Sequence, residues 1–201
     1  RRMKTQEKNI VNSEKRHSVC PVAKAGMLDH VLRKLIQDPA RILRPHVREG
    51  MAVLDVGCGP GFFTLEMARR VGEGGRVTAA DLQPGMLDLV RKKLAAAGLA
   101  GRATFHQCRA DAIGLPPGNG FDFILVFYML HEVPEPGSFL RELKSLLKPG
   151  GRVLVVEPRW HVGHGGFQDA IGLMKQAGFA VLAEPAIRFS RAVLIGDPGR
   201  D

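Results

Sequence analysis

Eleven residues, Val53 to Phe63, decide the fold, and they read Val-Leu-Asp-Val-Gly-Cys-Gly-Pro-Gly-Phe-Phe. The apolar run at Val53 to Val56 predicts a short strand that is buried on both faces. Glycines then occupy every second position, and a helical pattern starts at Thr64. Glycine lets the backbone adopt positive φ and approach a ligand closely, while the first turn of a helix presents unpaired N–H groups. The stretch therefore predicts a strand, a tight turn and a helix start that together bind a nucleotide-like ligand.

The spacing of the glycines separates two kinds of ligand. A dinucleotide fingerprint requires a third glycine at position 62, where the chain has Phe62. The register is instead Asp-x-Gly-x-Gly-x-Gly, which resembles motif I of class I S-adenosylmethionine-dependent methyltransferases. The resemblance implies that the loop holds the amino-acid end of the cofactor and that Asp55 pairs with a cationic group of it through loop amides or a water. The loop residues implied in cofactor binding are Gly57, Cys58, Gly59 and Gly61. A glycine-rich turn that only connects two elements is the alternative.

Length and composition indicate one globular domain. The chain has 201 residues, of which 45% are hydrophobic and 24% charged. No apolar run approaches the ~20 residues of a membrane span, and the N-terminus lacks the apolar segment of a secretory signal. Three scattered cysteines do not form a disulfide framework. We expect a cytoplasmic protein without a membrane span.

The net charge of +9 is concentrated near the N-terminus, where residues 1–50 hold twelve Lys or Arg and five Asp or Glu. A basic arm can bind nucleic acid or an anionic membrane surface, but no aromatic residue precedes Phe62 to stack on bases. A nucleic-acid partner is therefore the less favoured alternative. Apolar residues at helical spacing from Met27 to Ile36 predict a helix. We predict a basic extension with lid helices at 1–49 and a cofactor-binding domain at 50–201; by resemblance, Cys20 to Leu32 is a candidate lid.

A second acidic residue supports the cofactor. Asp81 ends the predicted strand Arg76 to Asp81 and lies twenty residues beyond Gly61, the separation at which a strand-terminal carboxylate accepts ribose hydroxyls. Its alternative role is to cap the helix that begins at Pro84. The resemblance implies that Leu82 and Met86 flank the adenine. It also implies that Asp111, which follows the predicted strand Ala103 to Cys108, accepts the adenine amino hydrogens beside Ala112.

The end of the apolar strand Phe121 to Phe127 bears on the acceptor. It continues Tyr-Met-Leu-His-Glu-Val and contains neither Asp/Asn-Pro-Pro-Tyr nor a Pro-Cys pair. Such an ending resembles small-molecule methyltransferases similar to those of quinone biosynthesis, and it implies that Phe127 touches the methionine end of the cofactor. His131 is the candidate base or substrate-orienting group, because imidazole accepts protons near neutral pH. Local packing of His131 is the alternative.

The C-terminal part contains a third sequence pattern that resembles this methyltransferase family. Leu-Lys-Pro-Gly-Gly at 147–151 precedes an apolar strand predicted at Val153 to Val156. Residues 159–166 contain Trp160, His161 and His164 and are expected to form a loop that borders the substrate pocket; we expect no metal site there.

Strand and helix alternate five times before a final helix and hairpin. Right-handed crossovers on this series give a doubly wound, Rossmann-like α/β domain. The resemblance implies seven strands with an antiparallel last strand and helices on both faces. The implied function is in-line transfer of a methyl group from S-adenosylmethionine to a small-molecule acceptor. The alternatives are an RNA-directed methyltransferase that uses the basic arm, a cofactor-binding module without turnover, and a nucleotide-dependent oxidoreductase, which Phe62 disfavours.

Overall fold

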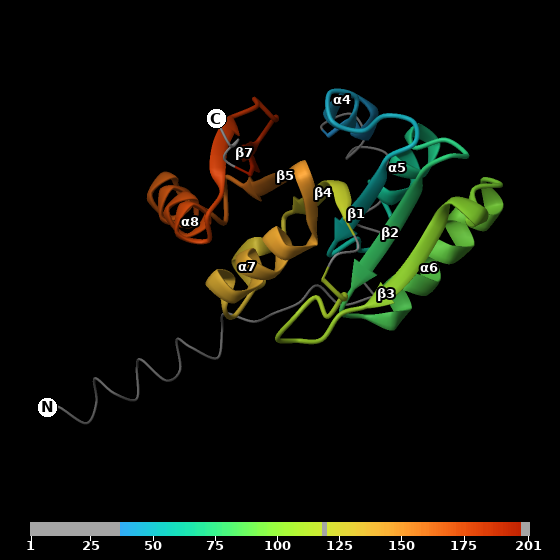
Figure 1. Ribbon diagram of the computed structural model, residues 1–201, viewed down its shortest axis with the longest axis horizontal. Helices are drawn as coiled ribbons and strands as arrows, with labels where there is room; N and C mark the ends of the chain where they lie inside the picture. Colours follow the sequence, from blue (N-terminus) through green and yellow to red (C-terminus); the bar gives the residue numbers. More distant parts are fainter. Residues whose placement is uncertain (1–36, 118–119, 198–201) are drawn as a thin grey trace, which may run out of the picture.

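The computed structural model describes residues 37–117 and 120–197. Alternating strands and helices form a single sheet with helices packed around it (Figure 1). The predicted helix of residues 27–36 and the candidate lid lie outside the described residues. In chain order the elements are α4 (Pro39–Leu43), β1 (Ala52–Val56), α5 (Thr64–Arg70), β2 (Arg76–Asp81), α6 (Pro84–Ala96), η2 (Ala100–Arg102), β3 (Ala103–Gln107), β4 (Phe121–Phe127), η3 (Leu130–Glu132), α7 (Pro136–Leu146), β5 (Leu147–Pro158), α8 (His164–Gln176), β6 (Ala180–Ala183) and β7 (Ser190–Gly196).

The sheet has seven strands in the order β3-β2-β1-β4-β5-β7-β6. The first five strands in that order run parallel, and β7 is antiparallel to both of its neighbours. The chain builds outward in one direction from β1 to β3 and then crosses back to place β4 on the other side of β1. In open α/β sheets, ligands bind at the carboxyl ends of the strands where the order reverses. The topology therefore points to the ends of β1 and β4 as the ligand site.

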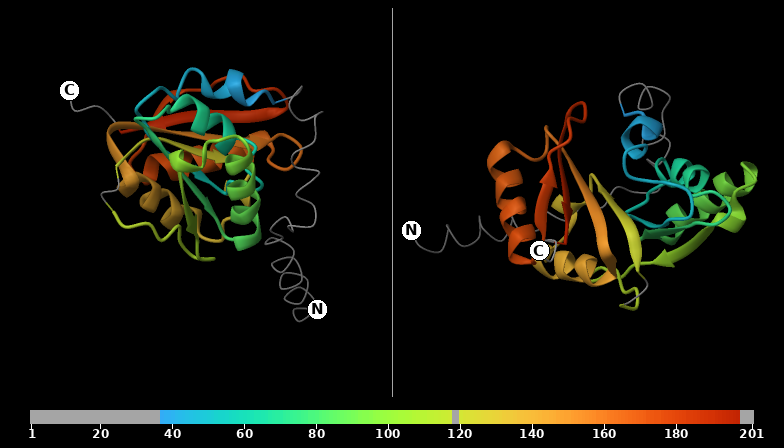
Figure 2. Two further views of the ribbon diagram at one scale, coloured as in Figure 1. Left: turned by 90° about the vertical axis from the view of Figure 1, so that its right-hand side faces the viewer. Right: turned by 45° about the horizontal axis from the view of Figure 1, so that its top comes forward.

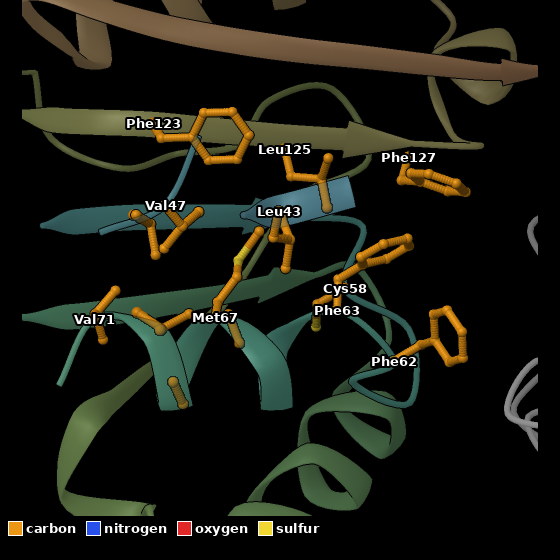
Figure 3. Packing of buried hydrophobic residues seen from close by; sticks show 14 of the residues in the cluster. Leu43, Val47, Cys58, Phe62, Phe63, Met67, Val71, Phe123, Leu125 and Phe127 are labelled. Atoms are coloured by element: carbon orange, nitrogen blue, oxygen red, sulfur yellow. The ribbon is translucent and has the colours of Figure 1, made fainter. Parts of the chain in front are cut away.

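Helices cover both faces of the sheet (Figure 2). On one face α4, α5 and α6 pack against alternate residues of the central strands, such as Val53 and Leu125. On the other face α7 and α8 cover the intervening residues, such as Leu54 and Ile124. Because both faces are covered, the central strands are almost entirely apolar, as the sequence predicted. Figure 3 shows that the apolar core under α4, α5 and α6 extends from Val71 to Phe62, so the glycine loop lies at one end of this core.

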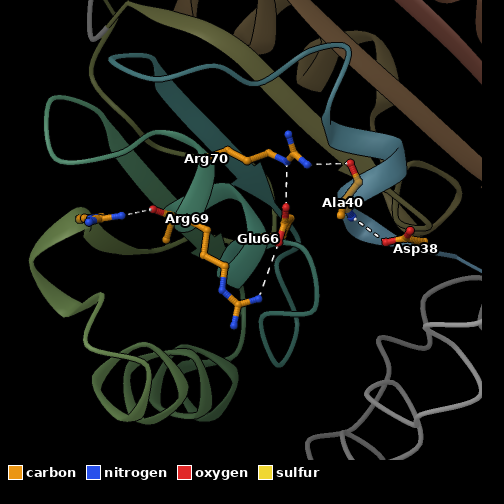
Figure 4. A network of polar contacts seen from close by, with 7 residues as sticks. Asp38, Ala40, Glu66, Arg69 and Arg70 are labelled. Carbon is orange, nitrogen blue, oxygen red and sulfur yellow. Dashed lines mark hydrogen bonds and ion pairs between the residues drawn. The ribbon is translucent and has the colours of Figure 1, made fainter.

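The short helix α4 is tied to α5 by polar contacts (Figure 4). Arg70 Nη2 donates to the carbonyl of Ala40 at 3.0 Å, while Arg70 Nε pairs with Glu66 at 2.9 Å. Asp38 caps α4 by accepting from the Ala40 N–H at 2.9 Å. Of the predicted N-terminal extension, the described part therefore packs on the domain.

Several boundaries differ from the predictions. Strand β1 begins one residue earlier than predicted, at Ala52, and β3 ends one residue earlier, at Gln107. The differences at β5 and α8 are larger. Strand β5 was expected at Val153 to Val156 but begins at Leu147, because Leu147 pairs with Phe121 across a register shift in the ladder with β4. Helix α8 begins at His164 after the N-cap Gly163, so the predicted loop is shorter by three residues. The prediction of a doubly wound sheet with an antiparallel last strand is confirmed. Within the two described ranges, no helix combines the length and apolarity that crossing a bilayer requires.

Candidate active site

A cavity of about 1170 Å³ lies at the carboxyl ends of the central strands, where the order of the sheet reverses. Ligand pockets commonly measure about 300–1,000 Å³, so this cavity has room for a nucleoside cofactor and a second small molecule. Almost every residue predicted for the site lines it: Asp55, Gly57, Cys58, Gly59, Asp81, Leu82, Met86, Asp111, Ala112, Phe127 and His131. Gly61 is the exception.

The glycine loop is held against the end of β2. Gly57 and Cys58 donate their N–H groups to the carbonyl of Ala80 at 2.8 and 3.1 Å. Gly59 has φ +52°, and a Cβ added there would meet no protein atom within 4 Å, so its backbone faces open space in the cavity wall. A Cβ at Gly61 would lie 3.1 Å from Val90 Cγ2. Gly61 therefore allows the start of α5 to pack closely on α6, whereas Gly59 leaves a cradle for a ligand.

Asp81 is a fixed carboxylate in the cavity wall, with only 7% of its surface exposed. One oxygen accepts the Gly59 N–H at 2.9 Å and the other accepts the Gln83 N–H at 2.9 Å. Burial raises the pKa of Asp81, while these backbone N–H groups act in the opposite direction. The N-cap of α6 is Gln83 rather than Asp81. Since a carboxylate oxygen accepts more than one hydrogen bond, both oxygens keep acceptor capacity for ligand hydroxyls.

The other two predicted acids lie in different surroundings. Asp55 is buried, and its Oδ2 accepts the Thr64 hydroxyl at 2.6 Å, a bond that joins the end of β1 to the start of α5. Asp111 is exposed at the rim and pairs with Arg109 at 3.1 Å. The hydrogen bond from Arg109 lowers the pKa of Asp111. Asp55 thus braces the loop, and Asp111 stays ionised at the cavity edge.

His131 is bonded to a buried acid that the sequence analysis did not single out. Glu157, at the end of β5, is 2% exposed; its Oε1 accepts the Leu130 N–H at 2.9 Å and its Oε2 bonds His131 Nδ1. This bond raises the pKa of His131, and desolvation opposes the shift. With Nδ1–H directed to the carboxylate, Nε2 is the nitrogen that accepts a proton in the neutral ring. A Cβ at Gly57 would lie 3.0 Å from Met129 Cγ, so the turn that carries His131 packs directly on the glycine loop.

Five aromatic side chains form a continuous wall from the glycine loop to the cavity edge. Consecutive ring centroids are separated by 5.1, 4.3, 4.5 and 5.6 Å. The members of this aromatic wall, in order, are Phe62, Phe63, Phe127, Tyr128 and Trp160. Figure 3 shows the first three at the end of the core. This wall of the cavity is therefore predominantly apolar.

Tyr128 takes an unusual backbone conformation in this wall, with φ +60°. Its hydroxyl bonds Ser190 Oγ at 2.6 Å and also Gln37 Nε2. Such strain in a non-glycine residue persists only where surrounding contacts enforce it, and it concentrates at functional sites. Three segments far apart in the sequence are joined at this hydroxyl.

Sequence reasoning missed Glu157, Tyr128 and Gln37 as site residues. One signal could have identified Glu157, because Asp55, Asp81 and Glu157 all end or nearly end strands whose carboxyl ends meet at one edge. Nothing in the sequence around Gln37 indicated its contact with a residue ninety-one positions away. The expected loop at the pocket border does contribute Trp160 and His161 to the lining.

The two histidines of that loop separate. His161 stacks on His131 with centroids 5.4 Å apart, whereas His164 starts α8. Among the residues that the structure describes, no group of three or more His, Cys, Asp or Glu is placed to hold a metal ion.

Comparison with known proteins agrees with this geometry. A family model described as a methyltransferase domain matches residues 47–177. Over 111 residues the chain is 41% identical to a ubiquinone/menaquinone biosynthesis C-methyltransferase, UbiE, of Escherichia fergusonii, a match that covers 55% of this chain and 44% of the relative. The corresponding protein of Cronobacter sakazakii is 40% identical over the same coverage. The chain thus spans less than half the length of these relatives.

A solved structure extends the likeness to the whole fold. A SAM-dependent methyltransferase from Aquifex aeolicus superposes with a TM-score of 0.78 and 28% sequence identity, covering 88% of this chain and 98% of that one. The expected family and fold are confirmed together by the family model and this neighbour. The chain belongs to the methyltransferase domain family, with the glycine loop and the strand-end carboxylates at the carboxyl edge of its sheet.

Proposed function

We propose that this protein transfers a methyl group from S-adenosylmethionine to a small, largely apolar acceptor that carries an ionisable hydroxyl. The residues present fit the cofactor: Gly59 leaves an open cradle beside Asp81, and Asp81 offers two fixed oxygens to a diol. Leu82 and Met86 line the neighbouring part of the cavity, where an adenine would meet apolar side chains, and Asp111 and Ala112 lie on the same wall. These residues would hold the nucleoside half of the cofactor.

When bound, S-adenosylmethionine supplies a methyl group on a positively charged sulfur that leaves as a neutral thioether. The chain then has to align an acceptor with that methyl group and exclude water. Orientation of this kind supplies about 7–11 kcal/mol of the barrier. Phe63 and Phe127 lie next to the glycine loop, which packs against the turn that carries His131. The protein therefore places a dry apolar wall and one base at the same end of the cavity.

The observation that carries the proposal is the bond between His131 and Glu157. The buried carboxylate holds the ring in one tautomer, so Nε2 can take the proton of an acceptor hydroxyl. Loss of that proton makes the oxygen of a phenol, or the ring carbon ortho to it, a stronger nucleophile. The proton stays on Nε2 while the new bond to the methyl group forms. With an oxygen nucleophile, that proton is then released to solvent. With a ring-carbon nucleophile, the methylated carbon loses its hydrogen as a proton and the oxygen regains a proton, so that the aromatic ring is restored and one proton is released overall.

The aromatic wall and the matched relatives together indicate the chemical class of the methyl acceptor. Aromatic side chains dominate the acceptor side, and the matched UbiE proteins are named for C-methylation in ubiquinone and menaquinone biosynthesis. A phenol or quinol ring fits such a wall by stacking. We therefore place phenols and quinols first among the acceptors.

The proposal is tested by methyl transfer from radiolabelled S-adenosylmethionine to a panel of phenols, quinols, thiols and tRNA. We expect product with a phenol or quinol and a loss of turnover of at least about 100-fold in His131→Ala, because general-base catalysis contributes about 10²–10⁴-fold. His164→Ala is the matched control, since His164 is exposed on α8 and does not line the cavity. Label in tRNA alone, or unchanged turnover in His131→Ala, contradicts the proposal.

A further inference from the structure

We propose that the rim of the cavity around Trp160 and Phe189 docks on an anionic phospholipid surface. These two are among the large hydrophobic side chains that the described chain exposes, with 65% and 50% of their surface accessible. Large apolar groups left open in this way are a recurring mark of interaction surfaces. We call the segments 158–164 and 185–191, which carry them, the rim.

The two rim segments lie side by side. Pro158 and Ser190 are partners in the antiparallel ladder between β5 and β7, and the Arg159 N–H donates to the Phe189 carbonyl at 3.1 Å. Trp160 contacts Tyr128 edge-on and lines the cavity. The aromatic wall of the cavity therefore reaches the rim at Trp160.

The charge of the rim is uniformly positive. Its two segments contain Arg159, Arg188 and Arg191, together with His161 and His164, and no acidic residue. The arginines are also held in place: Arg159 Nε donates to the Ser190 carbonyl at 2.9 Å, and Arg191 Nε donates to the Val162 carbonyl at 3.1 Å. A lipid headgroup region with net negative charge complements this pattern, and each basic residue near such a surface is worth about 1 kcal/mol.

Phe189 is presented in a strained conformation. Its φ is +58°, a region that bulky residues seldom occupy, yet its side chain is half exposed. Core packing does not offset the free-energy cost of this backbone conformation, since Phe189 is not part of the buried hydrophobic clusters. A contact outside the chain accounts for an exposed phenyl group at this position.

A bilayer fits the rim better than single-stranded nucleic acid does. Bases stack on open aromatic faces, but the Arg188 guanidinium lies over one face of Phe189, 5.0 Å from the ring centroid, and leaves fewer faces for stacking. Trp160 and arginine side chains suit the boundary between headgroups and acyl chains, because each combines an apolar body with a polar end. If the proposed function holds, an acceptor with an apolar tail could pass from the bilayer along the aromatic wall.

Trp160 is the only tryptophan of the chain, so its fluorescence reports on the rim alone. The experiment titrates the full chain with vesicles of pure phosphatidylcholine, with vesicles containing phosphatidylglycerol, and with a single-stranded RNA oligonucleotide. Brominated lipids serve as quenchers. We expect emission to move to shorter wavelength and to be quenched only with the anionic vesicles. The basic segment 1–36 can attach the chain to such vesicles without the rim, but attachment by that segment alone leaves Trp160 unshifted and unquenched.

Phe189→Asn is the test variant, because asparagine tolerates positive φ and lacks the ring. We expect it to weaken vesicle binding, measured by the shift and quenching of Trp160, by about tenfold or more, the effect of losing one buried phenyl group. Leu182→Ala is the matched control, since Leu182 is 47% exposed on β6 outside the rim, and it should bind as the parent does. Calorimetry with S-adenosylmethionine on the same samples separates this proposal from the previous one. No shift with anionic vesicles, a shift with RNA instead, or unchanged binding in Phe189→Asn overturns the docking surface even where cofactor binding is intact.

Discussion

Replacing Asp81 by asparagine tests the cofactor half of the site most directly. Each carboxylate oxygen accepts a backbone N–H, from Gly59 and from Gln83, both at 2.9 Å. An amide can accept only one of them, so the other N–H faces an NH₂ group. Leaving that donor unsatisfied costs about 1–3 kcal/mol of folding free energy. The variant also replaces a charge-assisted bond to a ribose hydroxyl, a further loss of about 1.5–3 kcal/mol, or roughly 10–150-fold in Kd.

The two losses are measured separately. Calorimetry with S-adenosylmethionine and with S-adenosylhomocysteine gives the change in Kd, and urea unfolding without ligand gives the change in folding free energy. Asp88→Asn is the control on helix α6, which follows Asp81 in the chain, because Asp88 is exposed and pairs only with Arg91 at 2.7 Å among the contacts described. If Asp81→Asn is destabilised but binds both ligands within twofold of the parent, Asp81 only braces the loop and the ribose assignment is refuted.

Three further perturbations follow from the same geometry. Glu157→Gln replaces the carboxylate that raises the pKa of His131 with a neutral amide, so the acid limb of the pH–rate profile should move to lower pH; an unmoved limb means that a different base operates. Gly59→Val should abolish cofactor binding in calorimetry. Gly98→Val is the control, because Gly98 (φ +70°) has a positive φ as Gly59 does (φ +52°) and is equally open, but does not line the cavity; it should lose stability and keep cofactor binding. Thr64→Val should lower the free energy of unfolding in urea by about 1–3 kcal/mol, because the buried Asp55 loses a hydrogen-bond donor. Thr78→Val is the control, since Thr78 bonds Thr104 in an exposed pair; a smaller loss in Thr64→Val than in Thr78→Val contradicts this view.

Local patterns predicted most of the fold. Strands β2 and β4 begin and end at the predicted residues, and helix α5 begins at the predicted residue, because apolar runs bounded by glycine, proline or acids leave little choice of register. Strand β5 was underestimated, since the pairing of Leu147 with Phe121 depends on a neighbour in space. The start of α8 was misplaced because Gly163, Gly165 and Gly166 gave no clear helix signal.

The site was predictable where one loop and its following strand end supply the groups. The motif spacing predicted Gly59 and Asp81 as residues of one site, and a hydrogen bond joins them. The partner of His131 was not predictable in the same way, because Glu157 comes from another strand twenty-six residues later. Tyr128 was likewise missed, since its importance rests on bonds to Ser190 and Gln37 that only the folded chain brings together. Motifs revealed contacts within one βα unit, and tertiary structure supplied the rest.

Because the strand order reverses between β1 and β4, different parts of the chain form the two sides of the cavity. Residues 55–86 surround the side of the cavity proposed for the cofactor, while residues 127–161 supply the proposed base and most of the aromatic wall. Evolution or an engineer can therefore change the second set for a new acceptor and leave the first set untouched.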